Sequence, residues 1–229
     1  MTRPTLVRKE LGLRSLLGSL KKRPGFGALS RKQRLAIAAA ATWAALYLCG
    51  TPWLASDWNG KDDVHLFLGK QGRREHAEVL ADQPSISHTF KPTASIDPAR
   101  PADVAARFQT RQIRNRALST LGVLLVELCL DKTFEQIQQE SQDNDFGASL
   151  EIPGTTSSVP PSSDFDVATG CIDEVFLSEG ELYGDAVQRC LRCEFPGRDV
   201  TKDFNFREFR QNFFEGVVAP VQATYESSI

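Results

Sequence analysis

Two groups of residues have types and spacings that could support chemistry. The carboxylates of Asp57, Asp62 and Asp63 surround a turn and could hold a cation through oxygen ligands, although such a cluster also serves as a solvated or capping feature. Cys190 and Cys193 have the two-residue separation of a zinc or redox hook, but zinc needs four ligands and the three histidines show no paired spacing. The alternative is two thiols on one amphipathic helix with Cys190 directed inward. We therefore predict no metal and no cofactor.

The catalytic motifs that can be recognised from short spacings are missing from the chain. It contains no G-x-S-x-G elbow, no H-E-x-x-H pair and no phosphate-binding loop of the P-loop type. A nucleic-acid site would depend on the basic N-terminal region alone, without interleaved aromatic residues. We therefore expect a protein that is not an enzyme and does not bind nucleic acid, and whose partner is another protein.

Composition indicates a cytoplasmic protein. The chain has 41% hydrophobic and 24% charged residues, which is ordinary for a soluble domain. Five cysteines, an odd number, favour a reducing compartment. The most apolar stretch, residues 35–49, is too short for a bilayer helix, which needs about 20 residues, so we predict no membrane span. The alternative for the N-terminus is a targeting segment, because it is basic and carries leucines on a helical stripe.

The charges are distributed unevenly along the chain. Residues 1–34 hold ten lysines and arginines and a single acid, Glu10, whereas the rest of the chain is acidic. This polarity could steer an anionic partner toward the N-terminal region, or it could reflect complementarity within the molecule.

Two strongly apolar segments are expected to form the core that positions any functional site. Residues 31–49 and 116–130 are apolar on nearly every face, which requires burial, and Ser30 has the type and place of an N-cap. We predict that these helices touch at the centre of the fold and that Trp53 is buried beside them. Further helices are expected at 11–22, 103–110, 167–177, 180–195 and 206–223, a short strand at 64–68, and a loop at 69–100.

The predicted organisation is a single domain over residues 11–222, with a basic tail at 1–10 and a second tail at 223–229. Residues 140–166 are rich in Ser, Asp, Gly and Pro and are expected to form a disordered insertion. The last helix should bury one apolar face, consisting of Phe206, Phe209, Phe213, Val217 and Val221. The fold class expected is mainly α with short strands.

The order of these segments resembles an uncharacterised fungal domain family that often follows prion-inhibition-and-propagation (HeLo-like) domains. The signature residues are Thr51, Pro52, Trp53 and Leu54 in TPWL, Gly122 and Glu127 in LGVLLVEL, and Tyr183 and Cys190 in YGDAVQRCL. The family in turn resembles the helical C-lobe of protein kinases, which implies a helical bundle in which residues 31–49 precede the catalytic loop and 116–130 form the central helix.

The kinase resemblance implies positions for the catalytic residues, and at most of these positions this chain has a residue of another type. Asp57 falls at the position of the catalytic base and Asp62 at that of the metal ligand, but Ala55 and Ser56 replace the preceding His and Arg. Ala117 replaces the Asp that anchors the central helix, and no D-F-G follows. We therefore predict a non-catalytic interaction or regulatory domain. The alternative is a degenerate kinase-like protein with residual nucleotide or metal binding.

Overall fold

The computed structural model describes residues 5–18, 28–51, 54, 58–70, 77–86, 115–148 and 164–228. The strands are β1 (Thr5–Gly12), β2 (Val64–Lys70) and β3 (Ala77–Ile86). The helices are α1 (Arg31–Leu48), α3 (Arg116–Leu130), α4 (Phe134–Ala148), α5 (Asp164–Gly170), α6 (Ile172–Glu179), α7 (Glu181–Arg192), α8 (Arg207–Phe213) and α9 (Ala219–Ser227). Short 3-10 turns are η1 (Leu13–Ser15), η2 (Gly60–Asp62) and η3 (Asp199–Thr201), and η4 (Phe214–Val218) is π-helical.

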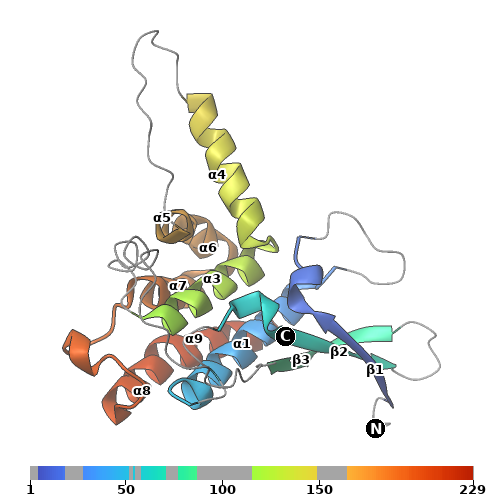
Figure 1. Cartoon of the computed structure of the whole chain (residues 1–229), viewed down its shortest axis with the longest axis horizontal. Coiled ribbons are helices and arrows are strands. Elements are labelled where there is room, and N and C mark those ends of the chain that lie inside the picture. Colours follow the sequence, from blue (N-terminus) through green and yellow to red (C-terminus); the bar gives the residue numbers. More distant parts are fainter. Residues whose placement is uncertain are drawn as a thin grey trace, which may run out of the picture.

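The helices pack against one another on one side of the molecule, and the small antiparallel sheet lies on the other (Figure 1). α3 lies at the centre and contacts α1, α6 and α7, while α9 covers α1 and α7. The sheet has the order β1-β2-β3 and meets the helices through contacts between β3 and α1. The prediction of a mainly α fold with short strands is confirmed, as is the contact between the two apolar helices.

α1 begins where the sequence predicts. The Ser30 side chain accepts a hydrogen bond from the Gln33 amide, and the Gln33 side chain accepts one from the Ser30 amide, which completes a capping box. The helix buries a face made largely of alanine, so its backbone can lie close to its neighbours. The helix ends at Leu48, and Gly50, two residues later, has a φ of 81°, which suits glycine better than any other residue.

α3 is buried on almost all sides, as its apolar composition predicts. The Asn115 side chain accepts a hydrogen bond from the Leu118 amide at its start, and Asp131 ends it in a left-handed conformation with φ 53°. The polar side chain in this helix that is fully buried is Glu127. A carboxylate in such a place must be paired, and its partners are described below.

The sheet contradicts two predictions. Residues 5–10, placed in a basic tail, form most of β1, and residues 77–86, placed in a loop, form β3. Both segments mix apolar residues with charged and polar ones, and each pairs antiparallel with β2, which supplies partners for their backbone groups. Pairing of this kind is decided by a strand distant in sequence, so local composition did not indicate it.

The helix expected at 11–22 is also wrong. Leu11 and Gly12 end β1, and a single 3-10 turn follows at Leu13–Ser15. The leucine stripe nevertheless packs into the core, because Leu13, Leu16 and Leu17 are buried. Residues 19–22, the helix expected at 103–110, and Trp53 lie outside the described residues.

The expected insertion at 140–166 is shorter than predicted. α4 continues to Ala148, and α5 begins at Asp164. Buried Phe134 and Ile137 anchor the first turn of α4 to the core, and the Gln138 side chain donates a hydrogen bond to Asp164 at 2.7 Å. The disorder predicted for the remaining residues, 149–163, lies outside the described residues.

The C-terminal helices follow the predictions with local breaks. The expected helix at 167–177 is divided between α5 and α6, and the one at 180–195 corresponds to α7. The last helical run continues to Ser227, past the expected end at 223, and changes to a π-helix at its centre. Four of its five predicted core residues are buried, but Phe206 is 46% exposed, because it precedes the first turn of α8.

Among the residues that the structure describes, no helix is both long enough and apolar enough to cross a bilayer.

Candidate functional site

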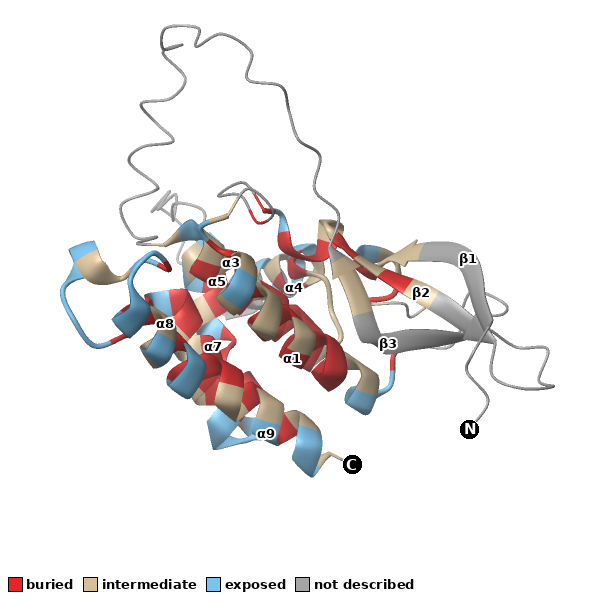
Figure 2. Ribbon diagram, turned by 90° about the horizontal axis from the view of Figure 1, so that it is seen from below, coloured by how far each residue is buried: buried red, intermediate tan, exposed pale blue. Residues whose placement is uncertain are grey.

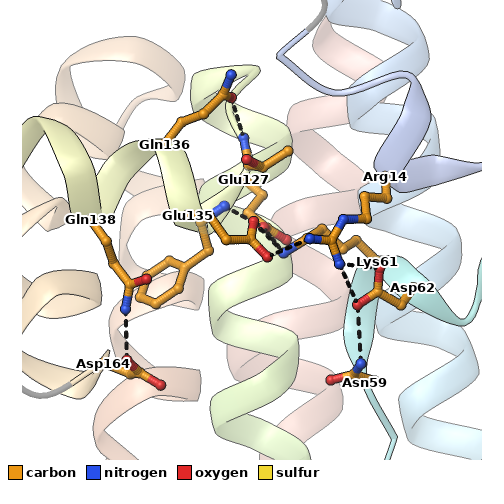
Figure 3. A network of polar contacts seen from close by, with 11 residues as sticks. Arg14, Asn59, Lys61, Asp62, Glu127, Glu135, Gln136, Gln138 and Asp164 are labelled. Atoms are coloured by element: carbon orange, nitrogen blue, oxygen red, sulfur yellow. Dashed lines mark hydrogen bonds and ion pairs between the residues drawn. The ribbon is translucent and has the colours of Figure 1, made fainter.

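A network of charged side chains connects the sheet side of the molecule to the central helices (Figure 3). Lys61 of η2 donates to Glu127 at 2.6 Å and lies 3.3 Å from Glu135. Arg14, just after β1, contacts both Asp62 at 3.1 Å and Glu135 at 3.0 Å. The network therefore joins η1, η2, α3 and α4, which come from distant parts of the chain.

Local structure explains how the two central charges meet. Gly60 has a φ of 59°, and a Cβ there would lie 3.3 Å from the Thr120 side chain, so glycine allows η2 to lie close against α3. Glu127 is in the last turn of α3, and its carboxylate also accepts the Phe134 amide at 2.6 Å. That amide is at the start of α4, where a helix leaves backbone donors without internal partners.

Burial sets the electrostatics of this pair. Lys61 is 8% exposed and Glu127 is 1% exposed. Burial alone would lower the pKa of Lys61, but the hydrogen bond and charge of Glu127, with help from Glu135, raise it overall. Burial raises the pKa of the Glu127 carboxyl, and the Lys61 ammonium and the Phe134 amide oppose that effect. The lysine therefore keeps its proton and is held at a fixed place against the carboxylate.

Asp62, the residue at the expected metal-ligand position, is engaged by protein groups. Its carboxylate accepts hydrogen bonds from Arg14 at 3.1 Å and from the Asn59 side chain at 3.0 Å. Asp63 accepts the Asn59 amide at 2.8 Å. Asp57 lies outside the described residues. Within the part of the chain that the structure describes, no group of three or more His, Cys, Asp or Glu side chains is placed to share a metal ion.

The predicted signature residues that the structure describes gather around the core helices. Gly122 packs against Leu191 of α7, and the Tyr183 hydroxyl donates to the Leu125 carbonyl at 2.9 Å. Cys190 is buried as predicted. Thr51 donates to the Leu48 carbonyl at the end of α1, and buried Leu54 forms an isolated bridge with Cys49. Pro52 and Trp53 lie outside the described residues.

All five cysteines are buried, and their surroundings suppress thiol chemistry. Burial raises the pKa of Cys49 and of Cys129 to about 12, and burial also raises the pKa of Cys190 and Cys171. A nucleophilic cysteine needs a lowered pKa and access to solvent. These thiols therefore act as small core groups.

We expect the native protein to react slowly with a thiol reagent at pH 8 and all five cysteines to react once it is unfolded. The same burial makes stability depend on pH. An unfolded thiol ionises near its ordinary pKa of 9.0, whereas folded Cys49 and Cys129 ionise near 12, so their stabilising contribution is complete below pH 9 and is lost as the pH rises toward 12. Thiol titration against time, with and without denaturant, measures the first effect. Rapid native labelling of Cys49 or Cys129 would contradict it.

A second feature is a partly exposed cluster of aromatic rings on α1 and η4, which we call the aromatic surface: Tyr47 and Phe214, which are exposed, and Trp43, which is partly buried against the core. The Trp43 and Tyr47 rings are stacked with centroids 5.7 Å apart and planes 12° from parallel. Phe214 is tilted against Trp43 at 5.6 Å. Tyr47 is 64% exposed and Phe214 is 36% exposed. These rings bring together two helical segments that lie side by side (Figure 2).

Polar side chains surround the aromatic surface and fix its shape. The Trp43 indole donates to the Gln222 side chain at 3.3 Å, and Gln222 donates to Glu226 at 2.8 Å. Gln211 is hydrogen-bonded to Glu215, the neighbour of Phe214. Arg189 donates to the Gly216 carbonyl, two residues after Phe214, so amides, carboxylates and a guanidinium all lie near the rings.

Neither feature was predicted from the sequence. Lys61 and Glu127 are 66 residues apart, and no local pattern connects them, although a glutamate inside an apolar helix is a signal that a buried partner exists. The aromatic surface had a clearer signal. Trp43 and Tyr47 are four residues apart in a helix whose other face is alanine-rich, so they must share the outer face.

Comparisons with known proteins place the chain in one family. A family model described as a domain of unknown function (DUF7580) matches residues 6–228. No curated protein and no solved structure matches the chain. Because the family match covers nearly the whole length, the chain belongs to the DUF7580 family of domains of unknown function.

Proposed function

We propose that this protein is a non-catalytic interaction or regulatory domain that works in the cytoplasm by binding another protein. The observation that carries the proposal is the aromatic surface, where Tyr47 is 64% exposed and stacked on Trp43. Aromatic residues are enriched at the energetic centres of protein interfaces. Exposure of stacked rings is costly for a domain that acts alone.

The buried charge network supports the same proposal. The charged groups near the expected catalytic positions are paired with other side chains of the protein. Lys61 is paired with Glu127, and Asp62 contacts Arg14 and Asn59. A catalytic carboxylate has to be available to substrate or metal. The network therefore favours a scaffold over an enzyme.

The resemblance of the motif order to the helical lobe of kinases, and to a fungal domain family, supports a scaffold derived from a kinase-like fold. Phosphoryl transfer needs a glycine-rich loop over the phosphates, a lysine and magnesium held by carboxylates. The sequence offers only Asp57 and Asp62 toward this set. Two carboxylates repel a triphosphate unless magnesium bridges them, so useful ATP affinity is not expected.

A thermal shift with millimolar Mg-ATP tests this proposal. We expect no rise in melting temperature, because a ligand adds little stability while its concentration is well below its dissociation constant. The measurement is repeated with Asp57→Ala and Asp62→Ala, each compared with its own ligand-free protein, since loss of the Arg14 contact lowers the baseline of the Asp62 variant. A rise of several degrees that disappears in both variants would restore the nucleotide-binding alternative.

A further inference from the structure

We propose that α4 undocks from the core as a unit, and that residues 13–18, which we call the strap, hold it in the docked position through Arg14. The movement takes place at the short connection between α3 and α4, where Asp131 has a left-handed conformation with φ 53°. It does not depend on the aromatic surface, which belongs to α1 and η4. It follows from three features: the sparse packing of α4, the contacts at its first turn, and the attachment of the strap.

α4 is attached to the rest of the protein mainly at one end, and it rises away from the other helices (Figure 1). Of the α4 side chains that the structure describes, those of residues 134–143, only Phe134 and Ile137 are buried. α7 is a shorter helix but buries six residues. One hydrogen bond, from Gln138 to Asp164 at 2.7 Å, connects α4 to α5. A segment with few buried contacts opens at a lower free energy than the core does.

The polar contacts at the first turn of α4 come from α3, from η2 and from the strap (Figure 3). Glu127 of α3 accepts the Phe134 amide at 2.6 Å. The next residue, Glu135, accepts from Arg14 of the strap at 3.0 Å and lies 3.3 Å from Lys61 of η2. The Arg14 side chain is 55% exposed and that of Glu135 is 48% exposed, so this ion pair is weak and is screened by salt. Small changes at Arg14 therefore shift the balance between docked and undocked α4.

The strap is attached to the core independently of α4. Leu13, Leu16 and Leu17 are buried, so these side chains hold the strap in place while α4 moves. β1 ends at Gly12 and continues directly into the strap. A partner that displaces β1 would therefore also displace Arg14, and α4 would be released.

Gly18 brings the end of the strap against the first turn of α4. Its amide donates to the Asp131 carbonyl at 3.1 Å, and a Cβ at this position would overlap the Gln136 side chain. Gln136 in turn accepts the Thr133 amide at 2.9 Å. The strap therefore contacts the first turn of α4 at two successive residues, Glu135 and Gln136.

Hydrogen exchange followed by mass spectrometry tests the proposal on the full chain. An isolated polar helix of 15 residues is marginally stable in water, so the amides of α4 exchange once it undocks. In the wild type they should exchange faster than those of α3. Arg14→Ala should speed exchange in α4 about threefold, the effect of losing an exposed ion pair, and should leave α3 unchanged. Glu135→Gln removes the same pair from the other side and should have a similar effect.

Salt and a matched variant provide the controls. Raising the salt concentration should speed α4 exchange in the wild type, and should do so less in Arg14→Ala, because salt screens the Arg14–Glu135 pair. Arg192→Ala is the matched control. Arg192 forms an exposed ion pair with Glu194 at 3.8 Å, but it lies at the end of α7, so its loss should leave exchange in α4 unchanged.

Three results would overturn the proposal. Equal protection of α4 and α3 in the wild type would mean that α4 opens only when the whole domain unfolds. Exchange that is faster by the same factor in α3 and α4 of Arg14→Ala would mean that Arg14 stabilises the entire fold. Unchanged α4 exchange in both Arg14→Ala and Glu135→Gln would mean that the strap does not hold α4 in place.

Discussion

Glu127→Ala should lower the free energy of unfolding by about 3–5 kcal/mol, the range found when one member of a buried ion pair is removed. The variant leaves the Lys61 ammonium, which is 8% exposed, without its closest partner. It also removes the acceptor of the Phe134 amide, a hydrogen bond of 2.6 Å that joins the end of α3 to the start of α4. Denaturant unfolding at neutral pH measures the change.

The matched control is Glu140→Ala. Glu140 accepts from Lys132 at 2.7 Å, a distance close to that of the buried pair, but the Glu140 side chain is 56% exposed and the Lys132 side chain is 35% exposed. Exposed pairs of this kind contribute about 0–1 kcal/mol. Comparable losses in the two variants would mean that burial does not make the Lys61–Glu127 pair special, and the structural account of the network would be wrong.

A double variant separates the cost of the unpaired lysine from the loss of the pair itself. Lys61→Met removes the charge while keeping much of the side chain's length. We expect Lys61→Met with Glu127→Ala to be more stable than Glu127→Ala alone, since no ammonium remains buried without a partner. A double variant as unstable as the sum of the two single variants would show that the residues act independently.

The helical core could be predicted from the sequence because its signals are local. α1 and α3 are identified by continuous apolar composition, and the Ser30 cap by its position before the first apolar turn. These signals act within a few residues of chain. They fixed the two central helices and their contact without any knowledge of the rest of the fold.

The sheet could not be predicted in the same way. β1 carries three charged residues, Arg8, Lys9 and Glu10, and its strand conformation depends on pairing with β2, more than fifty residues later. β3 likewise depends on β2. Where a segment's backbone partners are distant, composition alone favours a loop, and tertiary pairing overrides that preference.

The candidate site was reached only in part. Glu127 was selected as a signature residue of the LGVLLVEL segment and Asp62 because its position resembles that of a kinase metal ligand, but the structure gives each an internal partner: Lys61 for Glu127 and Arg14 for Asp62. The C-terminal stripe illustrates the opposite case. Periodicity correctly placed Phe209 and Phe213 in the core but could not reveal that Phe214, one position later, completes the aromatic surface with α1.

Gly122→Leu should abolish cooperative unfolding, or nearly so, because the side chain has no space to occupy. A Cβ at Gly122 would lie 2.8 Å from Cδ2 and 2.9 Å from Cγ of Leu191, and 3.1 Å from the Leu191 backbone nitrogen. α3 and α7 are both in the core, and Leu191 is buried, so neither helix can move aside without disturbing other contacts. Overpacking by smaller changes costs about 1–3 kcal/mol, and whole domains are stable by only about 5–15 kcal/mol.

Three further variants provide a control for this prediction and test whether the clash with Leu191 causes the loss of stability. Gly170→Ala, at a helical glycine with no atom within 4 Å of the new Cβ, should change stability by about 0.5 kcal/mol or less. Gly122→Ala should destabilise measurably, and Leu191→Ala should reduce the additional cost of Gly122→Ala by making room for the methyl group. Calorimetry and denaturant unfolding of the single and double variants measure this coupling. A Gly122→Leu protein with the wild-type melting temperature would show that α3 and α7 do not pack closely at this glycine, and with that the central helix packing described here would fail.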